Sequence, residues 1–179
     1  MANDGLMLAL DVESDLWTQQ EISYEQKIAN LTKTVLRAEA PALLSAKYLE
    51  LSVVLTNNAE IQKLNKRFRG KDKPTDTLSF PGSLSDPLTE NSEDPEILPI
   101  ILGDIVLAYE TMTQDAADFD LSFHDHFSHI VVHSLLHLLG HDHEDPADAM
   151  IMEQKEIQIL STLGIENPYE QRDTGEQVL

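Results

Sequence analysis

Cysteine is absent from this 179-residue chain, which excludes disulfide bonds and thiolate metal ligands. Basic residues are scarce: 12 Lys and Arg stand against 32 Asp and Glu, a formal charge of −20. Such a charge weakens non-specific binding to RNA by bulk repulsion. The chain also lacks a run of about 18 apolar residues, and its N-terminus lacks a basic-then-apolar signal pattern. We therefore expect a cytoplasmic protein that does not enter membranes.

Apolar residues make up 41% of the chain, and its length suits one domain with a core of its own. We expect this domain to cover residues 1–165. A long acidic loop is expected as an insertion at residues 82–99, which carry three prolines and five acids. Residues 166–179 are expected to form a polar C-terminal tail. Both segments are poor core material because they have few apolar side chains to bury.

Hydrophobic periodicity and turn signals predict an α+β fold, a mixed α/β layer in which a sheet of about four strands packs with about five helices. The strands are expected at residues 6–12, 50–56, 76–80 and 100–108. The helices are expected at residues 22–38, 58–68, 109–117, 124–139 and 146–163. Gly103 and Asp104 interrupt the apolar run of the last strand and indicate either a bulge or a structural hydrogen bond. The order is therefore βαβαββααα, with helix 124–139 packed centrally against the sheet.

All seven histidines lie within residues 124–143, and three of them form the pattern H-x3-H-x2-G-x2-H: His133, His137 and His143. Histidines four positions apart lie on one helix face, so both imidazoles can reach one cation. Gly140 can take the left-handed conformation that ends a helix, which lets the chain bring His143 back. Three protein nitrogens leave one tetrahedral position open, as in catalytic zinc sites. We predict one Zn²⁺ per chain, although nickel, copper or iron would fit the same ligands.

Two further histidines have alternative interpretations. His129 lies one turn before His133 on the same face, so it is a candidate to support the ligands or to contact substrate, or it has no role. By counting four positions, His141 is an alternative third ligand. The break expected at Gly140 favours His143 instead.

The remaining histidines and one aspartate carry weaker signals. His124 and His126 are expected to be solvated near the helix start. Asp142 is expected either to orient a ligand or to act as a loop cap.

The histidine spacing also matches the metzincin pattern of zinc proteases, with one exception. Those enzymes need a glutamate directly after the first histidine as general base, and this chain has Ser134 there. A hydroxyl cannot take up the proton of a water as a carboxylate does. The peptidase interpretation therefore loses its base, while the ligand set remains.

A second group of residues is basic. Six of the 12 basic residues lie at positions 63–73, within a segment that reads NKRFRGKDKPTDTLSFP at residues 65–81. In so acidic a chain this clustering favours a local anion-binding patch. Arg69 presents a planar fork that matches phosphate oxygens. A metal site together with an arginine-rich patch predicts phosphodiester chemistry.

Other side chains of this segment are candidate substrate contacts. Lys71 and Lys73 are predicted to steer the backbone of a phosphodiester substrate. Phe68 and Phe80 are candidates for stacking a base.

The sequence HSLLHLLGHDH, together with FRGKDKPTDTLSFP and LGDI upstream, resembles the YbeY family of ribosomal RNA maturation endoribonucleases. The family pattern H-G-x-L-H-L-x-G-x-D-H is kept except at Ser134, where the family has glycine. The resemblance covers about residues 45–165.

This resemblance implies a single-strand-specific, metal-dependent endoribonuclease that matures the 3′ end of small-subunit (16S) rRNA and acts in ribosome quality control. It places the metal ligands at His133, His137 and His143 and the catalytic arginine at Arg69. The implied partners are single-stranded rRNA and the small ribosomal subunit.

Two alternative functions stay open, a metzincin-like metal-dependent peptidase and a non-catalytic ribosome-assembly factor whose metal is structural. The charge of −20 favours docking through a protein of the small subunit or an assembly GTPase, with RNA touched only at the basic patch. We expect neither DNA nor membrane partners.

Overall fold

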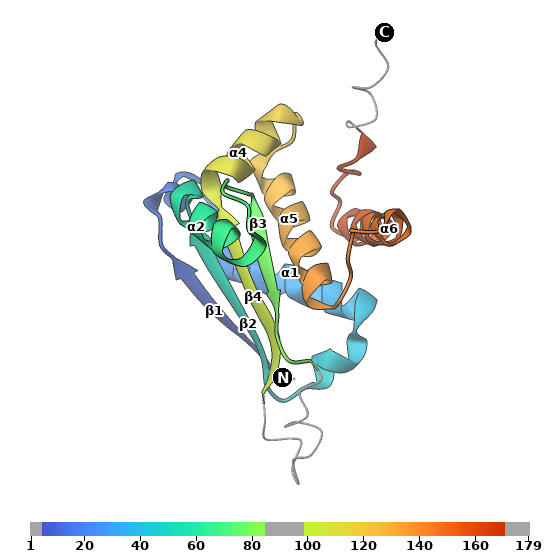
Figure 1. The fold of residues 1–179 in the computed structure, drawn as a ribbon. Coiled ribbons are helices and arrows are strands. Elements are labelled where there is room, and N and C mark those ends of the chain that lie inside the picture. Colours follow the sequence, from blue (N-terminus) through green and yellow to red (C-terminus); the bar gives the residue numbers. More distant parts are fainter. Residues whose placement is uncertain (1–4, 85–98, 171–179) are drawn as a thin grey trace.

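The computed structural model describes residues 5–84 and 99–170, so most of the loop and tail expected at 82–99 and 166–179 lies outside the described residues. Four strands form one mixed sheet in the order β1-β2-β4-β3 (Figure 1). Three of them run parallel, namely β1 (Leu6–Val12), β2 (Leu49–Thr56) and β4 (Ile100–Ala108). The edge strand β3 (Thr77–Pro81) pairs antiparallel with β4.

Five α-helices lie in the described residues: α1 (Tyr24–Glu39), α2 (Asn58–Arg69), α4 (Tyr109–Asp118), α5 (Phe123–Leu138) and α6 (Pro146–Thr162). The predicted α+β fold and its element order are confirmed. Two short 3-10 helices, η1 (Asp15–Gln19) and η2 (Pro41–Ser45), were not predicted. Within the described residues, no helix is both long and apolar enough to cross a membrane.

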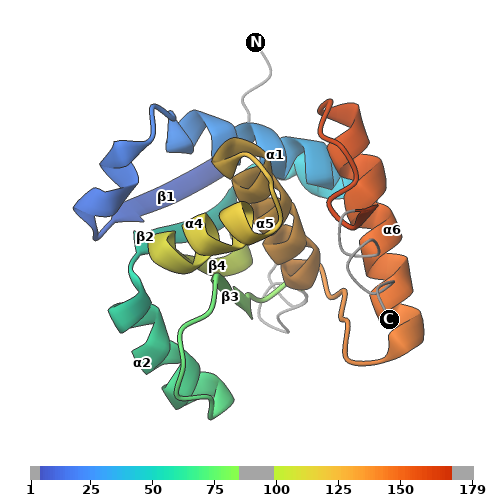
Figure 2. The ribbon, with the colours of Figure 1, turned by 90° about the horizontal axis from the view of Figure 1, so that it is seen from above.

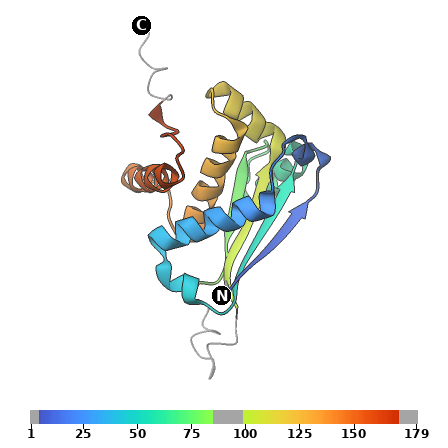
Figure 3. The same ribbon diagram turned by 180° about the vertical axis from the view of Figure 1, so that it is seen from behind.

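The sheet separates two layers of helices (Figure 2). The face covered by α1 and α5 carries the main core, to which β2 contributes Leu51, Val53 and Leu55. Figure 3 shows α1 lying across this face. The opposite face is covered by α2, whose Ile61 packs on Val106 of β4. Helix α6 packs against α5 and α1 on the side away from the sheet, so α5 is enclosed between the sheet and α6.

A bulge in β4 confirms the irregularity predicted at Gly103. Glu50 pairs with Ile101, but the next residue, Leu51, pairs with Gly103, so one residue of β4 is left over. Gly103 has a φ of 135°, and a Cβ there would clash with the carbonyl oxygen of Phe80. Only glycine fits both the conformation and the close approach of β3.

An aromatic cluster that the sequence did not predict joins η1 to the helices. Trp17 is fully buried, and its indole Nε1 donates to the carbonyl oxygen of Thr56 at 2.8 Å. The rings of Tyr24 and Tyr109 lie edge-on to it, each at a centroid distance of 5.3 Å. The cluster gives the N-terminal segment a fixed place on the core.

Candidate metal centre

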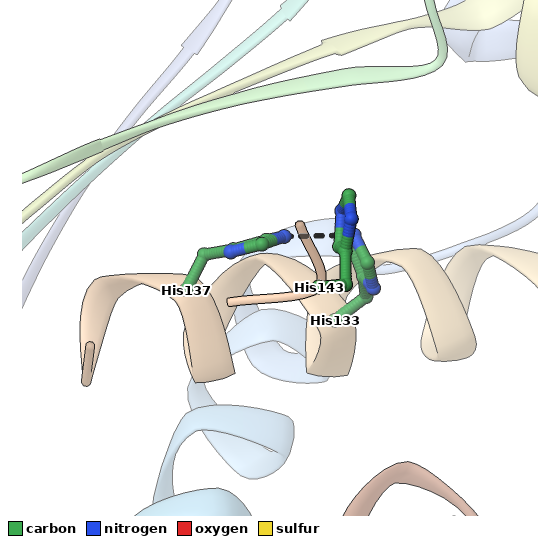
Figure 4. A group of neighbouring side chains, drawn as sticks. All are labelled: His133, His137 and His143. Atoms are coloured by element: carbon green, nitrogen blue, oxygen red, sulfur yellow. Dashed lines mark hydrogen bonds between the residues drawn. The ribbon is translucent and has the colours of Figure 1, made fainter. Parts of the chain in front are cut away.

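Three histidine side chains meet at the C-terminal end of α5 (Figure 4). His133 and His137 come from the last turns of α5, and His143 comes from the loop that follows it. One ring nitrogen from each of the three lies within 4.8 Å of the others, a spacing at which the group could hold a metal ion. Nε2 of His133 and Nε2 of His137 are 3.1 Å apart.

The turn after α5 brings His143 back to the helix. Gly140 has a φ of 94°, as expected for the residue that breaks the helix, and the backbone N–H of His141 donates to the carbonyl of Leu136 at 3.0 Å. The side chain of His141 points elsewhere, because its Nε2 lies 3.3 Å from a carboxylate oxygen of Glu39. His143, and not His141, therefore joins the two helical histidines.

Hydrogen bonds fix the orientation of both helical rings. Nδ1–H of His133 donates to Oε1 of Glu156 on α6, at 2.7 Å. Nδ1–H of His137 donates to the carbonyl oxygen of His141, at 2.9 Å. With both Nδ1 atoms engaged, each ring presents the lone pair of Nε2 to the common centre. This donor set fits a metal cation that accepts imidazole nitrogen.

Electrostatics favour the protonation states that a metal needs. Burial and the neighbouring ring of His133 lower the pKa of His137 to about 4, so the ring is neutral at pH 7. Burial raises the pKa of Glu156, but the hydrogen bonds from His129 and His133 outweigh it and lower the pKa to about 2. A neutral ligand beside an ionised, buried carboxylate is the arrangement found around zinc-bound histidines.

Arg69 approaches this region from the other face of the sheet. It is the last residue of α2, which ends because Gly70 takes the left-handed conformation with a φ of 69°. The guanidinium Nη2 donates to the carbonyl oxygen of Ser79 on β3 at 3.3 Å. The hydroxyl of Thr77, on the same strand, lies 2.9 Å from the hydroxyl of Ser134 on α5, and this contact ties β3 to α5. Strand β3 thus lies between Arg69 and the helix of the histidines.

The cations around Arg69 divide into paired and unpaired groups. Lys63 contacts Glu60 and Lys66 contacts Asp72, each at 2.7 Å. In the part of the chain that the structure describes, four exposed cations of this segment have no carboxylate within ion-pair distance: Arg67, Arg69, Lys71 and Lys73. These four form the basic patch.

A family model described as endoribonuclease YbeY matches residues 15–164. The chain belongs to the endoribonuclease YbeY family. Endoribonuclease YbeY of Paramagnetospirillum magneticum is 41% identical over 165 residues, covering 90% of this chain and 94% of the relative. That of Rhizobium johnstonii is 38% identical over 171 residues, covering 94% and 95%. That of Sphingopyxis alaskensis is 47% identical over 131 residues, covering 72% and 76%.

The fold has a counterpart among solved structures. The solution structure of TM1509 from Thermotoga maritima superposes with a TM-score of 0.51 and 22% identity, covering 95% of this YbeY-family chain and 94% of that one. At this identity the likeness concerns the fold.

Glu156 is the residue of this YbeY-family site that the sequence did not predict. Its side chain is 1% exposed and accepts hydrogen bonds from His129, His133 and Tyr169. The sequence contained one indication that Glu156 is buried, because this residue shares a helix face with the apolar residues Met152 and Ile159. A carboxylate on an apolar helix face needs buried partners, and the histidine segment was one candidate source of them.

The structure also places the three histidines that precede His133. His129 is 3% exposed, and its Nε2–H donates to Oε2 of Glu156 at 2.7 Å. This favours support of the ligands over contact with substrate. The expectation that His126 is solvated is wrong, because it is 1% exposed and its ring lies edge-on to His129 at 6.2 Å. His124 is exposed as expected. The difference arises because helices pack on α5 from several sides, so it has almost no solvent face.

Proposed function

We propose that this protein is a metal-dependent endoribonuclease that cleaves single-stranded RNA. One Zn²⁺ per chain is held by His133, His137 and His143, and Arg69 contacts the scissile phosphate. The observation that carries the proposal is that three ring nitrogens converge beside strand β3. Arg69 contacts the same strand from the opposite face of the sheet. Membership of the endoribonuclease YbeY family supports RNA as the substrate.

The residues divide the chemistry between them. When bound, the cation would supply Lewis-acid chemistry to a phosphate oxygen or to water. Arg69 directs its fork at the non-bridging phosphate oxygens and stabilises the charge that develops there. Lys71 and Lys73 hold the flanking backbone, because both are exposed and lie directly after Arg69. Glu156 keeps His133 in one orientation throughout.

Within this proposal the substrate is rRNA, cleaved near the 3′ end of small-subunit rRNA, and the protein also serves ribosome quality control. Ribosome assembly places this work in the cytoplasm. The charge of −20 supports a route in which a small-subunit protein or an assembly GTPase positions the enzyme and RNA meets only the basic patch. DNA and membranes have no part in it.

The peptidase alternative finds no support at Ser134. This residue stands where a metzincin has its general base, yet its hydroxyl is fully buried and bonded to Thr77 on β3. It therefore cannot take up the proton of a water at the histidine group.

The proposal is tested with an end-labelled single-stranded RNA that carries the mature 3′ end of small-subunit rRNA. Wild type is compared with His137→Ala, Arg69→Ala and the control His141→Ala, which removes a nearby ring outside the histidine group. We expect cleavage by wild type and the control only, with about one zinc per chain in wild type, the control and Arg69→Ala.

Other outcomes discriminate between the alternatives. Equal cleavage by wild type and His137→Ala would indicate a contaminating nuclease, and cleavage by neither would favour an assembly factor. Loss of zinc in Arg69→Ala would show that this arginine has a structural role. Loss of zinc in His141→Ala would transfer the third ligand to that residue.

A further inference from the structure

One aromatic ring on the outside of the molecule has no role in the metal centre. Phe68, in the last turn of α2, is 53% exposed, whereas the other four phenylalanines of the chain are half-buried or buried. A phenylalanine that leaves half of its surface in water gives up part of the free energy that burial would supply. Its surroundings show what could cover it.

The exposure follows from the position of α2 over the edge of the sheet. Ile61, Leu64 and Phe68 share the helix face that points at the sheet, at helical spacing. Ile61 reaches the central strand β4 and is fully buried, but Phe68 packs on Phe80 of the edge strand β3 and stays exposed. The two rings pack edge-on at a centroid distance of 5.2 Å. Phe80 therefore holds the Phe68 ring in place without covering it.

Positively charged side chains flank the ring of Phe68. The guanidinium of Arg67 lies 5.1 Å from the centroid of Phe68. Arg69, one residue further on, is bound to the Ser79 carbonyl of the same edge strand that carries Phe80. An exposed ring among unpaired cations, on a chain of charge −20, fits a ligand that combines a flat apolar face with negative charge. A nucleotide of single-stranded RNA has both.

We propose that Phe68, backed by Phe80 and flanked by Arg67, stacks an unpaired base of the RNA whose phosphate Arg69 contacts. The inference rests on the proposed function and deepens it by naming a base-binding subsite. Because α2 and α5 lie on opposite faces of the sheet with β3 between them, the RNA strand crosses the edge of β3 on its way to the histidine group (Figure 2). Bases inside a duplex have both faces covered, so the subsite selects single strands.

The test uses binding in the absence of cleavage. Every variant carries His137→Ala, and the probe is a single-stranded RNA oligonucleotide with one 2-aminopurine, whose fluorescence falls when it stacks. Phe68→Leu keeps apolar packing on Phe80 but removes the aromatic face, and Phe68→Tyr keeps the face. Tyr48→Leu is the matched control, because Tyr48 is also exposed and has Lys47 over its ring at 5.4 Å, outside the basic patch.

We expect Phe68→Leu to weaken binding of the single strand by about tenfold and to abolish the fluorescence change, as for the loss of one stacked base. Phe68→Tyr is expected to retain both, and a hairpin of the same composition should bind Phe68→Leu and the parent equally. Unchanged binding in Phe68→Leu would overturn the subsite. So would an equal loss with the hairpin, or with Tyr48→Leu, since neither offers the proposed stack.

The subsite and the nuclease can fail separately. If the chain with intact histidines cleaves RNA, and Phe68→Leu changes neither kcat nor KM, the nuclease stands and the subsite falls. If no RNA is cleaved but the fluorescence change still depends on Phe68, the base-binding subsite is supported and the proposed nuclease activity is refuted. Melting temperatures of all variants identify any general loss of folding, which is not expected at a half-exposed position.

Discussion

Glu156 connects the candidate metal centre to the rest of the protein. Its two oxygens accept from different histidines, with Oε1 serving His133 and Oε2 serving His129. Tyr169 also donates to Oε2, so a residue near the end of the described chain belongs to the same network. A carboxylate this buried is stable only with its donors in place. The same bonds prevent the ring of His133 from rotating away from the centre.

The expected consequence is that Glu156→Gln weakens zinc binding about 10- to 100-fold, the usual effect of removing such a partner. An amide cannot accept equally from both histidines, because its nitrogen is a donor. Glu153→Gln is the control, since Glu153 is exposed on the same helix. Zinc affinity is measured by competition with a chromophoric chelator. Equal affinities of Glu156→Gln and wild type would refute the positioning role.

Strand β3 and helix α5 are joined by a pair of hydroxyls. The hydroxyl of Ser134 is fully buried and lies 2.9 Å from that of Thr77. Ser134 directly follows His133, so the pair fixes α5 against the strand that Arg69 contacts. Where the family pattern has glycine, this chain has an additional link between the two elements.

Thr77→Val is expected to destabilise the fold by about 1–3 kcal/mol, because the buried hydroxyl of Ser134 is left without its partner. Adding Ser134→Ala should recover part of this loss, since the unsatisfied group is then removed. Urea unfolding of the single and double variants measures the coupling. Strictly additive effects would mean that the two hydroxyls do not depend on each other.

Over the whole molecule, the basic patch contrasts with the acidic charge of the chain, which bears on the proposed RNA binding. The chain has a formal charge of −20, yet the basic patch of Arg67, Arg69, Lys71 and Lys73 is exposed and unpaired within the described residues. Under the proposed function, we expect repulsion elsewhere to confine phosphate contacts to the patch.

This distribution predicts the salt dependence of binding. Four phosphate contacts to a single strand give a slope of log K against log salt of about −3. The slope is measured by titrating the single-stranded oligonucleotide at several salt concentrations, with Lys71→Gln and Lys66→Gln as matched variants. Lys71→Gln should reduce the slope, while Lys66→Gln should not, because Lys66 is paired with Asp72. A much steeper slope would place RNA outside the patch.

The aromatic cluster makes folding sensitive to high pH. The hydroxyl of Tyr24 donates to the carbonyl of Trp17, and burial, with a smaller effect of Tyr109, raises the pKa of Tyr24 from 10.0 to about 12. The unfolded chain therefore ionises first. The stability due to this group is complete below about pH 10 and is lost as pH rises through about 12.

Tyr24→Phe should therefore lose less stability than wild type between about pH 10 and 12, because it has no proton to release there. Urea unfolding followed by the fluorescence of Trp17, the single tryptophan, measures the difference. Parallel pH profiles for the two proteins would contradict the assignment.

Features set by neighbours along the chain were predictable from the sequence. His133 and His137 share a helix face because they are four positions apart, and Gly140 turns the chain because it alone tolerates a positive φ there. The strands and helices follow from their apolar periods, with ends that differ from the prediction by one or two residues.

Features that depend on which element faces pack together could be identified only from the folded structure. Glu156 is 23 positions from His133, and Thr77 is 57 positions from Ser134. The burial of His126 and the support of Phe68 by Phe80 likewise depend on neighbouring elements. The helical period of a sequence indicates which face of a helix is apolar or charged. Which element contacts that face depends on how the elements pack around the sheet. The ligand spacing is therefore local, while the orientation and surroundings of the ligands are tertiary.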